Sequence, residues 1–500
     1  MKREANRSSL RFLVGGLLLV LAACGDGSEA GLSPVEESLG THEAAVCAGS
    51  NVTTLSISGA STYQGVMAAS GTWAVAYPAN AVRLEYYIDG VLRSSDERTS
   101  ASGTWYYSSA GFTCGISHTL QVRATPMVID SSGNRTVCWE NVRSASQIVI
   151  ESCPIIGGQA HSLALKQDGT VWSWGWNGFG TLGDGTNLQR NTPVRSGITS
   201  PSAVASFGNH TMAVKPDGTV WAWGDNEYGE LGDGTTTHRY TPVQVPGINN
   251  VITVATGIYH TVALKRDGTV WAWGANNYGS LGDGTTTQRN TAVQVPGINN
   301  VIAVSAGFYF TLALKQDGTV WAWGYNGYGQ LANGTTTSRS TPVQVPGLSN
   351  VSAISAGHSF ALALKKDGTV WSWGYNGSGQ LGDGTATTRL TPVMVSGLSG
   401  VTLIAASYDH AVALRQDGTV WTWGSNYQGQ IGDGTKTQRR TPVQVPGLGS
   451  ITAVAVGGNH TMAARQDGTV WTWGWNYYGQ LGDGTTTERL SPVLVPGLSL

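Results

Sequence analysis

The stretch GIYHTVALKRDGTVWAWGANNYGSLGDGT, residues 257–285, decides the fold because it recurs along the chain in nearly the same form. Its seven copies place equivalent residues at a first step of 49 and then at steps of 50: His161, His210, His260, Phe310, Phe360, His410 and His460. Repetition at such a period indicates an array of similar structural units rather than one large core. We therefore treat residues 154–500 as seven repeats.

Each repeat has the pattern of four short antiparallel strands. The segments TVALK (261–265) and TVWAWG (269–274) flank Asp267-Gly268, a dipeptide typical of a tight hairpin turn. An apolar stretch (250–257) precedes the hairpin, and AVQV (292–295) follows it. Four strands cannot bury both faces of a sheet alone, so the repeats must stack in an open solenoid or a closed ring.

Tryptophan favours the closed ring. Fourteen of the 19 tryptophans stand in the W-x-W pairs of the repeats, where both indoles point to one face of the sheet. We expect both of them to be buried between neighbouring sheets, since each buries a large apolar area. Seven units lie within the usual range of propellers. The sequence predicts an all-β protein with a seven-bladed β-propeller.

The charge content excludes some classes of partner. The net charge is −2 and only 12% of residues are charged, about half the usual share. Nucleic-acid binding depends on clustered lysine and arginine. We expect no nucleic-acid partner.

The first 24 residues have the pattern of an export signal. Basic residues precede an apolar run at 12–23, which is too short to span a bilayer. The run ends in LAAC (21–24), which resembles the lipoprotein signal peptide of bacteria, with Cys24 as the lipidated residue. An ordinary secretory signal is the alternative. We expect an exported lipoprotein at the outer membrane or cell surface of a bacterium, with residues 25–45 as a flexible acidic tether.

Residues 46–153 form a small domain in which apolar and polar residues alternate within short segments, the pattern of β-strands. These segments are 53–59, 71–77, 81–95, 117–126 and 146–151. Asp89-Gly90 signals a hairpin within the third of them. Seven or so strands in about a hundred residues suit a β-sandwich. The segment resembles bacterial immunoglobulin-like modules, which implies a role as a stalk; direct ligand binding by this domain is the alternative.

Four cysteines fall in this small domain: Cys47, Cys114, Cys138 and Cys153. Their even number in an exported chain favours two disulfides, for which three connectivities exist. Folding the chain back about DSSGN (130–134) brings Cys114 near Cys153 and leaves Cys47 with Cys138.

The repeat itself resembles that of the regulator of chromosome condensation family, over about 345 residues. The resemblance implies a seven-bladed propeller. It does not fix the activity, because the family includes a nuclear guanine-nucleotide exchange factor, ubiquitin-ligase subunits and secreted inhibitors of β-lactamases. The even spacing of the repeats leaves no room for the β-wedge with which the exchange factor works.

The repeated polar residues favour structural roles. Two of the seven histidine positions are Phe310 and Phe360, so a packed histidine with one hydrogen bond is favoured over a metal ligand. The phrase LGDGT has Asn333 in place of Asp in one copy, and both residues suit the turn. The repeated arginines, one in each copy, cannot converge as the arginine cluster of a sialidase. We expect no catalytic residue, no metal, no cofactor and no enzyme.

The repeats differ most in two loops, which leave the same edge of an up-and-down sheet. Large stiff rings collect there, as they do in binding sites. We expect an extracellular or periplasmic protein partner; a lectin-like role is the alternative, and a glycoside hydrolase or exchange factor is less favoured. The candidate binding face consists of Trp176, Phe179, Tyr228, Tyr259, Tyr278, Phe308, Tyr309, Tyr325, Tyr328, His358, Tyr375, Tyr408, Asp409, Tyr427, Trp475, Tyr477 and Tyr478.

Overall fold

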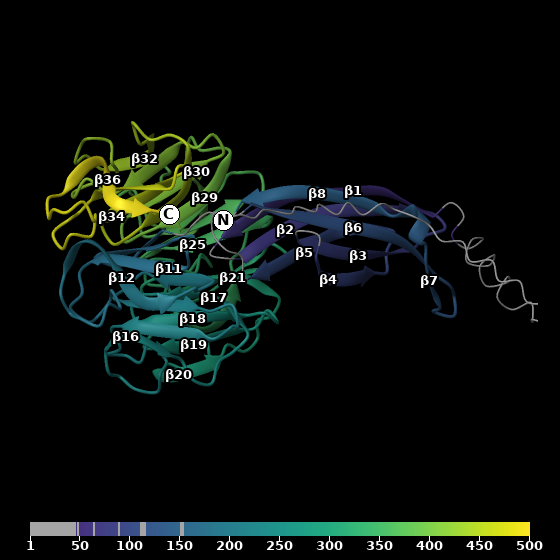
Figure 1. Cartoon of the computed structure of the whole chain (residues 1–500), viewed down its shortest axis with the longest axis horizontal. Coiled ribbons are helices and arrows are strands. Elements are labelled where there is room, and N and C mark those ends of the chain that lie inside the picture. The colour runs from purple at the N-terminus through teal and green to yellow at the C-terminus, as the bar shows by residue number, and fades with distance from the viewer. Residues whose placement is uncertain (1–46, 48–49, 64–65, 89–90, 111–116, 151–154) are drawn as a thin grey trace, which may run out of the picture.

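The computed structural model describes residue 47 and residues 50–63, 66–88, 91–110, 117–150 and 155–500. Figure 1 shows two parts: β1 to β8 form a narrow body that projects from a larger array of sheets. The expected signal peptide (1–24) with Cys24, the tether (25–45), Cys114 and Cys153 lie outside the described residues.

The small domain consists of two antiparallel sheets. One contains β1 (Asn51–Tyr63), β2 (Val66–Ala76) and β5 (Ser102–Ala110). The other contains β3 (Ala81–Ile88), β4 (Val91–Arg98), β6 (Ser117–Ile129), β7 (Arg135–Val137) and β8 (Arg143–Ile150). Side chains from both sheets share one core, in which Trp73 and Trp105 meet Leu84, Tyr86 and Val122. Strands β5 and β7 are absent from the prediction.

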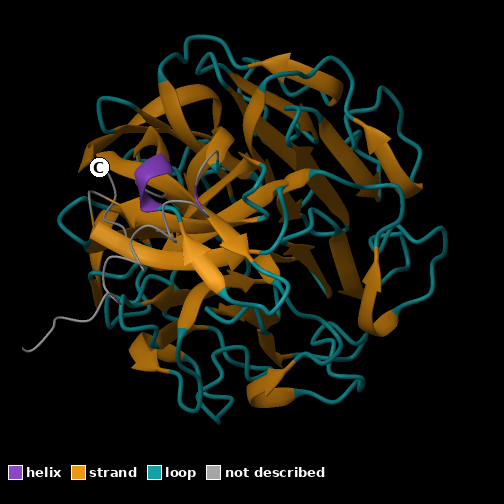
Figure 2. Ribbon diagram, turned by 90° about the vertical axis from the view of Figure 1, so that its right-hand side faces the viewer, coloured by secondary structure: helices purple, strands orange, loops and turns teal. Residues whose placement is uncertain are grey.

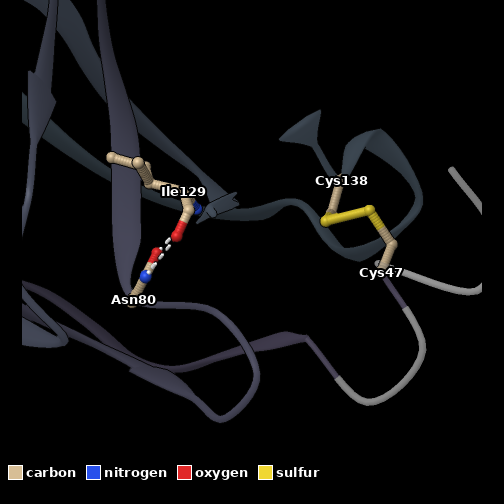
Figure 3. The surroundings of a disulfide bond; sticks show 4 residues. All are labelled: Cys47, Asn80, Ile129 and Cys138. Atoms are coloured by element: carbon tan, nitrogen blue, oxygen red, sulfur yellow. Dashed lines mark hydrogen bonds between the residues drawn. A yellow bond between two sulfur atoms is a disulfide. The ribbon is translucent and has the colours of Figure 1, made fainter. Parts of the chain in front are cut away.

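A disulfide joins Cys47 to Cys138, just before the short 3-10 helix η1 (Trp139–Asn141), with 5.4 Å between the two Cα atoms. It is the pairing that the sequence favoured for these two cysteines. Figure 3 shows a pair of hydrogen bonds nearby. The Asn80 side chain accepts one from the Ile129 amide and donates one to the Ile129 carbonyl, both at 2.8 Å. In the predicted hairpin, Ile88 of β3 pairs with Val91 of β4. Its turn, Asp89-Gly90, lies outside the described residues.

The repeats form four-stranded antiparallel sheets, numbered here from 1 to 7 along the chain. Sheet 1 contains β9 (Ile155–Gly157), β10 (His161–Leu165), β11 (Thr170–Gly175) and β12 (Arg190–Thr199). Sheet 2 contains β13 (Ala203–Ser206), β14 (His210–Val214), β15 (Val220–Gly224) and β16 (Arg239–Gln244). Sheet 3 contains β17 (Val251–Thr256), β18 (His260–Lys265), β19 (Val270–Gly274) and β20 (Arg289–Gln294).

The remaining sheets repeat this order. Sheet 4 contains β21 (Val301–Ala306), β22 (Phe310–Lys315), β23 (Val320–Gly324) and β24 (Arg339–Gln344). Sheet 5 contains β25 (Val351–Ala356), β26 (Phe360–Lys365), β27 (Val370–Gly374) and β28 (Arg389–Met394). Sheet 6 contains β29 (Val401–Ala406), β30 (His410–Arg415), β31 (Val420–Gly424) and β32 (Arg439–Gln444). Sheet 7 contains β33 (Ile451–Val456), β34 (His460–Arg465), β35 (Thr469–Gly474) and β36 (Arg489–Ser499).

The all-β, propeller-like array of repeated four-stranded sheets is confirmed, and so is the central hairpin of each repeat. In sheet 3, His260 pairs with Gly274 and Leu264 with Val270, which leaves Asp267 in the turn. Each sheet comes from one uninterrupted stretch of chain. In Figure 2 the strands of the array lie around a circle.

The two tryptophans of each pair have different environments. The second one, Trp273 in sheet 3, is fully buried, and its Nε1 donates to the backbone carbonyl of Glu230 in sheet 2 at 2.9 Å. The first one, Trp271, is only partly buried and lies under the ammonium group of Lys265, 5.0 Å from the ring centroid. The prediction that both are buried between sheets therefore holds in full for the second tryptophan and only in part for the first, which packs against the core shared by sheets 2 and 3. A lysine or arginine covers the remaining part of its ring through a cation–π contact.

Hydrogen bonds between second tryptophans and carbonyl groups link all neighbouring sheets, including the last to the first. Trp174 of sheet 1 donates to the carbonyl of Gln480 of sheet 7. Ser162 of sheet 1 bonds the imidazole of His460 of sheet 7 at 2.8 Å. Strand β9 also packs beside β33 and β34. The side chains of sheets 1 and 7 share a core, with Trp174 beside Met462 and Val470.

Candidate binding face

Two loops of every sheet leave from the same edge. In sheet 3 these are the short loop between Thr256 and His260 and the long loop between Gly274 and Arg289. Because strands alternate in direction, the hairpin turn and the connection to the next sheet lie at the opposite edge. We call the surface formed by the two loops the aromatic face.

A buried asparagine holds each long loop. Asn276 is fully buried, and its Nδ2 donates to Asp283 Oδ1 (3.2 Å) and to the carbonyls of Thr285 (3.2 Å) and Thr287 (3.1 Å). Its Oδ1 accepts a hydrogen bond from the Leu281 amide at 3.0 Å. Every sheet repeats this network, with Asn177, Asn226, Asn326, Asn376, Asn426 and Asn476 at the same place. The long loops are therefore rigid supports for the side chains that they carry.

The aspartate of LGDGT closes the turn of the long loop. Asp283 Oδ1 accepts hydrogen bonds from the amide (2.9 Å) and the hydroxyl (2.7 Å) of Thr285, and its Oδ2 accepts one from Arg289 (3.0 Å). Burial opposes ionisation of this carboxyl group, but the hydrogen bonds outweigh it and lower its pKa. The arginine thus pairs within its own loop, which confirms the structural role predicted for the arginines.

Asn333 keeps the turn without the charge. Its Oδ1 accepts from the amide and hydroxyl of Thr335 at 3.1 and 2.8 Å. Within the described residues, Arg339 has no acidic partner, whereas six of its equivalents have one. The preceding residue, Ala332, has φ +53° where the other sheets have glycine. The turn interpretation of this acid is confirmed, and sheet 4 carries two local defects in one loop.

The recurrent histidines, which begin the second strand of their sheets, are packed groups, as predicted. His260 is fully buried, its Nε2 bonds Thr311 Oγ1 of the next sheet at 3.0 Å, and burial lowers its pKa to about 3. His210 bonds Thr261, and His410 bonds Thr461, in the same manner. Where the histidine is Phe310 or Phe360, the matching residue of the next sheet is Ala361 or Ala411, each in the same core cluster as its phenylalanine. Histidine and hydroxyl are thus exchanged together for phenylalanine and alanine.

The larger group of predicted rings forms a continuous series of contacts over sheets 2 to 6. Tyr228 contacts Tyr259, with 5.1 Å between the ring centroids. From Tyr259 the contacts continue through Phe308, Tyr309, Tyr278, Tyr325, Tyr328 and Tyr375. A branch from Phe308 passes through His358, stacked at 4.3 Å, to Tyr408.

A smaller group lies where sheets 7 and 1 meet. Trp176 contacts Phe179 and Tyr478, and Tyr478 contacts Trp475 and Tyr477. Tyr427 makes no ring contact within the part of the chain that the structure describes, and Asp409 accepts a hydrogen bond from Gln380 Nε2 at 2.9 Å. The most exposed rings of the face are Tyr278 and Tyr328 (both 43%), Tyr427 (64%) and Tyr477 (67%).

The structure adds two rings to the face that the prediction lacks. Phe207 of sheet 2 contacts Tyr408 of sheet 6 at 5.8 Å. His238 stacks on Phe179 at 4.5 Å and lies 3.2 Å from Asp225 Oδ1. Phe207 could have been found from the sequence, because the other repeats have glycine or serine at that place: Gly158, Gly257, Gly307, Gly357, Ser407 and Gly457.

Among the described residues no group of three or more His, Cys, Asp or Glu could hold a metal ion. No helix within the described ranges is long and apolar enough to cross a membrane.

Comparison with known proteins identifies the family. The model of the RCC1-like domain matches residues 108–361, which is about half of the chain. The chain belongs to the RCC1-like family. Regulator of chromosome condensation (RCC1) repeats are matched at 367–414, 417–464 and 467–499. The propeller is therefore an RCC1-like protein-interaction scaffold.

Solved structures with this fold include human WBSCR16, which is 23% identical with a TM-score of 0.60 over 65% of this chain and 94% of that one. Prp20p of Saccharomyces cerevisiae is 25% identical with a TM-score of 0.59, over 67% of this chain and 88% of its own. A stretch of 41 residues is 49% identical to the ultraviolet-B receptor UVR8 of Arabidopsis thaliana, and it spans 8% of this chain and 9% of the receptor.

Proposed function

We propose that the chain is an exported, surface-anchored binding protein whose RCC1-like propeller holds a protein partner on its aromatic face. The observation that carries the proposal is the unbroken series of ring contacts from Tyr228 to Tyr375, on loops of neighbouring sheets. Large rings lose little conformational entropy on binding and dominate the energetics of protein interfaces. The buried asparagines keep the loops ordered before a partner arrives, which lowers the entropic cost further.

The scaffold is proposed to be a closed ring of seven blades. The hydrogen bond from Trp174 to Gln480 and the pair Ser162–His460 support closure, since each repeats a contact made between the other sheets. A closed ring leaves no apolar end of the stack in water.

The small domain is proposed to be an immunoglobulin-like stalk behind an anchor at Cys24. Its two sheets around one core and the Cys47–Cys138 disulfide support this role, because disulfides persist in oxidising compartments. Mass spectrometry of the mature N-terminus tests the anchor. An unmodified Cys24, or a chain that starts elsewhere, would contradict it.

The relatives support protein binding as the general behaviour. The structure of Prp20p is described together with its binding to Gsp1p and histones. We carry over the mode of action and not those partners.

Capture of surface proteins from the native cells by the immobilised full mature chain tests the proposal. Tyr328→Ala combined with Tyr477→Ala removes two exposed rings and should abolish capture while leaving the Tm nearly unchanged. Lys366→Ala, an exposed residue at the opposite edge, is the matched control and should capture normally. Equal capture by the double variant would refute the proposal. Saturable binding on a glycan array, with no protein captured, would favour the lectin-like alternative.

A further inference from the structure

One corner of the aromatic face is acidic, and its acids stand apart from the pattern of the repeats. Glu230 of sheet 2 occupies a position at which four other sheets have glutamine: Gln330, Gln380, Gln430 and Gln480. It is fully buried, and its Oε2 accepts a hydrogen bond from the Tyr228 amide at 2.7 Å. Gln330 Oε1 accepts the equivalent bond from the Tyr328 amide at 2.9 Å. The second carboxylate oxygen of Glu230 therefore stands where a glutamine has its amide nitrogen.

By comparison with the equivalent glutamines, this second oxygen faces the next sheet. In Gln380 and Gln430 the amide nitrogen reaches a side chain 29 residues further on, Asp409 at 2.9 Å and Asn459 at 3.4 Å. The residue 29 positions after Glu230 is Tyr259. Glu230 Oε1 is buried without a hydrogen-bond partner. In Gln330 and Gln480 the atom at the equivalent place is the amide nitrogen Nε2. It is also buried without a hydrogen-bond partner, but it belongs to a neutral group.

Two further carboxyl groups of the same loop lie beside Glu230. Asp225 is buried and has His238 as its neighbour, whereas Glu227 is exposed. Within the described residues, none of these three acids has a lysine or arginine nitrogen within 4.0 Å. Burial, and then the negative charge of Asp225, raise the pKa of Glu230 to about 8. Near neutral pH the free chain therefore keeps a proton on Glu230, and a cation that approaches the corner would favour the ionised form of this carboxyl group.

Tyrosine rings wall this corner. Tyr259 lies 5.1 Å from Tyr228 and 5.4 Å from Tyr309, and Tyr278 lies 5.2 Å from Tyr309. Burial, followed by the charges of neighbouring tyrosines and of Glu230, raises the pKa of Tyr309 to about 12. Tyr309 therefore stays neutral, and the negative π-face of its ring lies near the carboxyl groups.

A buried glutamate is less stabilising than a glutamine at the same position, because the charged form of its carboxyl group is poorly solvated there. Local features that cost stability with no structural return are concentrated at functional sites. Glutamine at the same place in four sheets shows that the fold has no need of the acid.

We propose that this corner, formed by Tyr228, Tyr259, Tyr278 and Tyr309 with Asp225, Glu227 and Glu230, receives a basic side chain, lysine or arginine, from the protein partner. The inference rests on the proposed function of the aromatic face and specifies the chemistry of its partner. A cation over tyrosine rings gains from the ring quadrupoles, and nearby carboxylates add attraction that salt weakens. Glu227, the exposed acid, can pair directly with the incoming cation.

The test uses the full mature chain and four small probes: the N-acetyl amides of lysine, arginine, Nε-acetyl-lysine and glutamate. Ligand-observed NMR titration at low salt should show saturable binding of the lysine and arginine probes in the millimolar range. Nε-acetyl-lysine, which has the same stem without the charge, should bind at least about fivefold more weakly, as expected for a single cation–π contact.

Glu227→Gln combined with Glu230→Gln should weaken binding of the basic probes about five- to tenfold and reduce its salt dependence. This variant should fold, since glutamine is found at the second position in four other sheets. Lys366→Ala, exposed at the opposite edge of the array, should bind the probes like the parent chain. Absence of saturable binding by both basic probes, equal binding of the acetylated probe, or unchanged affinity of the double variant would each overturn the inference.

These titrations are independent of partner capture. Suppose that Tyr328→Ala with Tyr477→Ala abolishes capture while Glu227→Gln with Glu230→Gln captures normally. The aromatic face then binds protein, and the inference that the partner supplies a basic side chain is wrong. If nothing is captured yet the basic probes bind as described, the proposed function fails and the cation site stands.

Discussion

The indole nitrogen of Trp174 in sheet 1 donates a 2.9 Å hydrogen bond to the backbone carbonyl of Gln480 in sheet 7. Trp323 makes the same bond to Ser280 between sheets 4 and 3, also at 2.9 Å. The junction between the two ends of the array is thus built like an interior one, and the stability of the two junctions can be compared directly.

Trp174→Phe and Trp323→Phe should lower the free energy of unfolding by similar amounts, about 2–4 kcal/mol, because each removes a hydrogen bond and leaves a cavity at a fully buried position. Urea denaturation of the two variants measures this. If Trp323→Phe lowered the free energy of unfolding strongly and Trp174→Phe left it almost unchanged, the array would be open between sheets 7 and 1.

The exchange of histidine and hydroxyl for phenylalanine and alanine predicts an energetic coupling. Phe310→His alone should destabilise the protein, since its imidazole faces Ala361 without a hydrogen-bond partner. Adding Ala361→Thr should recover about 1 kcal/mol beyond additivity, because the pair then matches His260 with Thr311. A double-mutant cycle by chemical denaturation provides the number. Strict additivity would show that the matched residues do not interact.

The buried histidines make the propeller sensitive to acid. Their pKa in the folded protein is about 3, against 6.5 in the unfolded chain, because burial disfavours the charged form. Below pH 6.5 the unfolded chain takes up protons that the folded protein does not, so stability is complete above this pH and falls toward pH 3. Each histidine should contribute about 1.4 kcal/mol per pH unit.

His410→Phe with Thr461→Ala introduces the pairing seen at Phe360 and Ala411. Below pH 6.5 the free energy of unfolding of this variant should fall less steeply with decreasing pH, by the contribution of one histidine. Urea titrations between pH 7.5 and 4.5 measure the slope. An unchanged slope in this variant would assign the acid sensitivity to other groups.

Glu230 should act in the opposite direction. Its pKa in the folded protein is raised to about 8 from 4.5, so the folded state keeps a proton that the unfolded chain releases. The resulting stability is present at low pH and is lost as the pH rises from about 4.5 to 8. Glu230→Gln should therefore raise the Tm at pH 8.5 and change it little at pH 4.5.

Gln330→Glu is the matched control, because it places an acid at the same buried position in sheet 4. It should lower the Tm at pH 8.5 and leave it nearly unchanged at pH 4.5. A Glu230→Gln variant whose Tm shifts equally at both pH values would show that this carboxyl group ionises normally in the folded protein.

Ala332 holds a left-handed backbone conformation at φ +53°, where Gly282 of sheet 3 has φ +71°. A side chain at this φ costs about 1 kcal/mol or more. Ala332→Gly should therefore raise the free energy of unfolding by about 1 kcal/mol, less the lost packing of its methyl group against the core of Trp373. The reverse change in sheet 5, Gly382→Ala, should destabilise the protein. Opposite signs for the two variants are the expected result of differential scanning calorimetry, and a destabilised Ala332→Gly would contradict it.

The repeat made the sheets predictable from the sequence, because alternation, turn residues and tryptophan spacing agreed in every copy. The first tryptophan of each pair is only partly buried, and the sequence did not show that Lys265 and its equivalents would cover the rest of the ring. Strand β5 was missed because SGTWYYSSA has mostly small polar residues and no apolar alternation.

The rings of the candidate face could be found in the sequence, but not their contacts. The contact between Phe207 and Tyr408 depends on how sheets 2 and 6 approach each other across the array, and no local pattern encodes that geometry. Glu230 was overlooked because its neighbours in the sequence follow the repeat, and its burial becomes visible only in the folded chain.

Each sheet is built from one uninterrupted stretch of chain, so the boundary between any two repeats separates whole sheets. Circular permutants that join residue 500 to residue 155 through a short linker and open the chain elsewhere would keep every sheet intact. The same arrangement lets a gene lengthen or shorten by duplication or loss of complete repeats without leaving a sheet unfinished. An array whose sheets are divided at equivalent places along the chain is therefore easy to recombine, and its loops can diversify one sheet at a time.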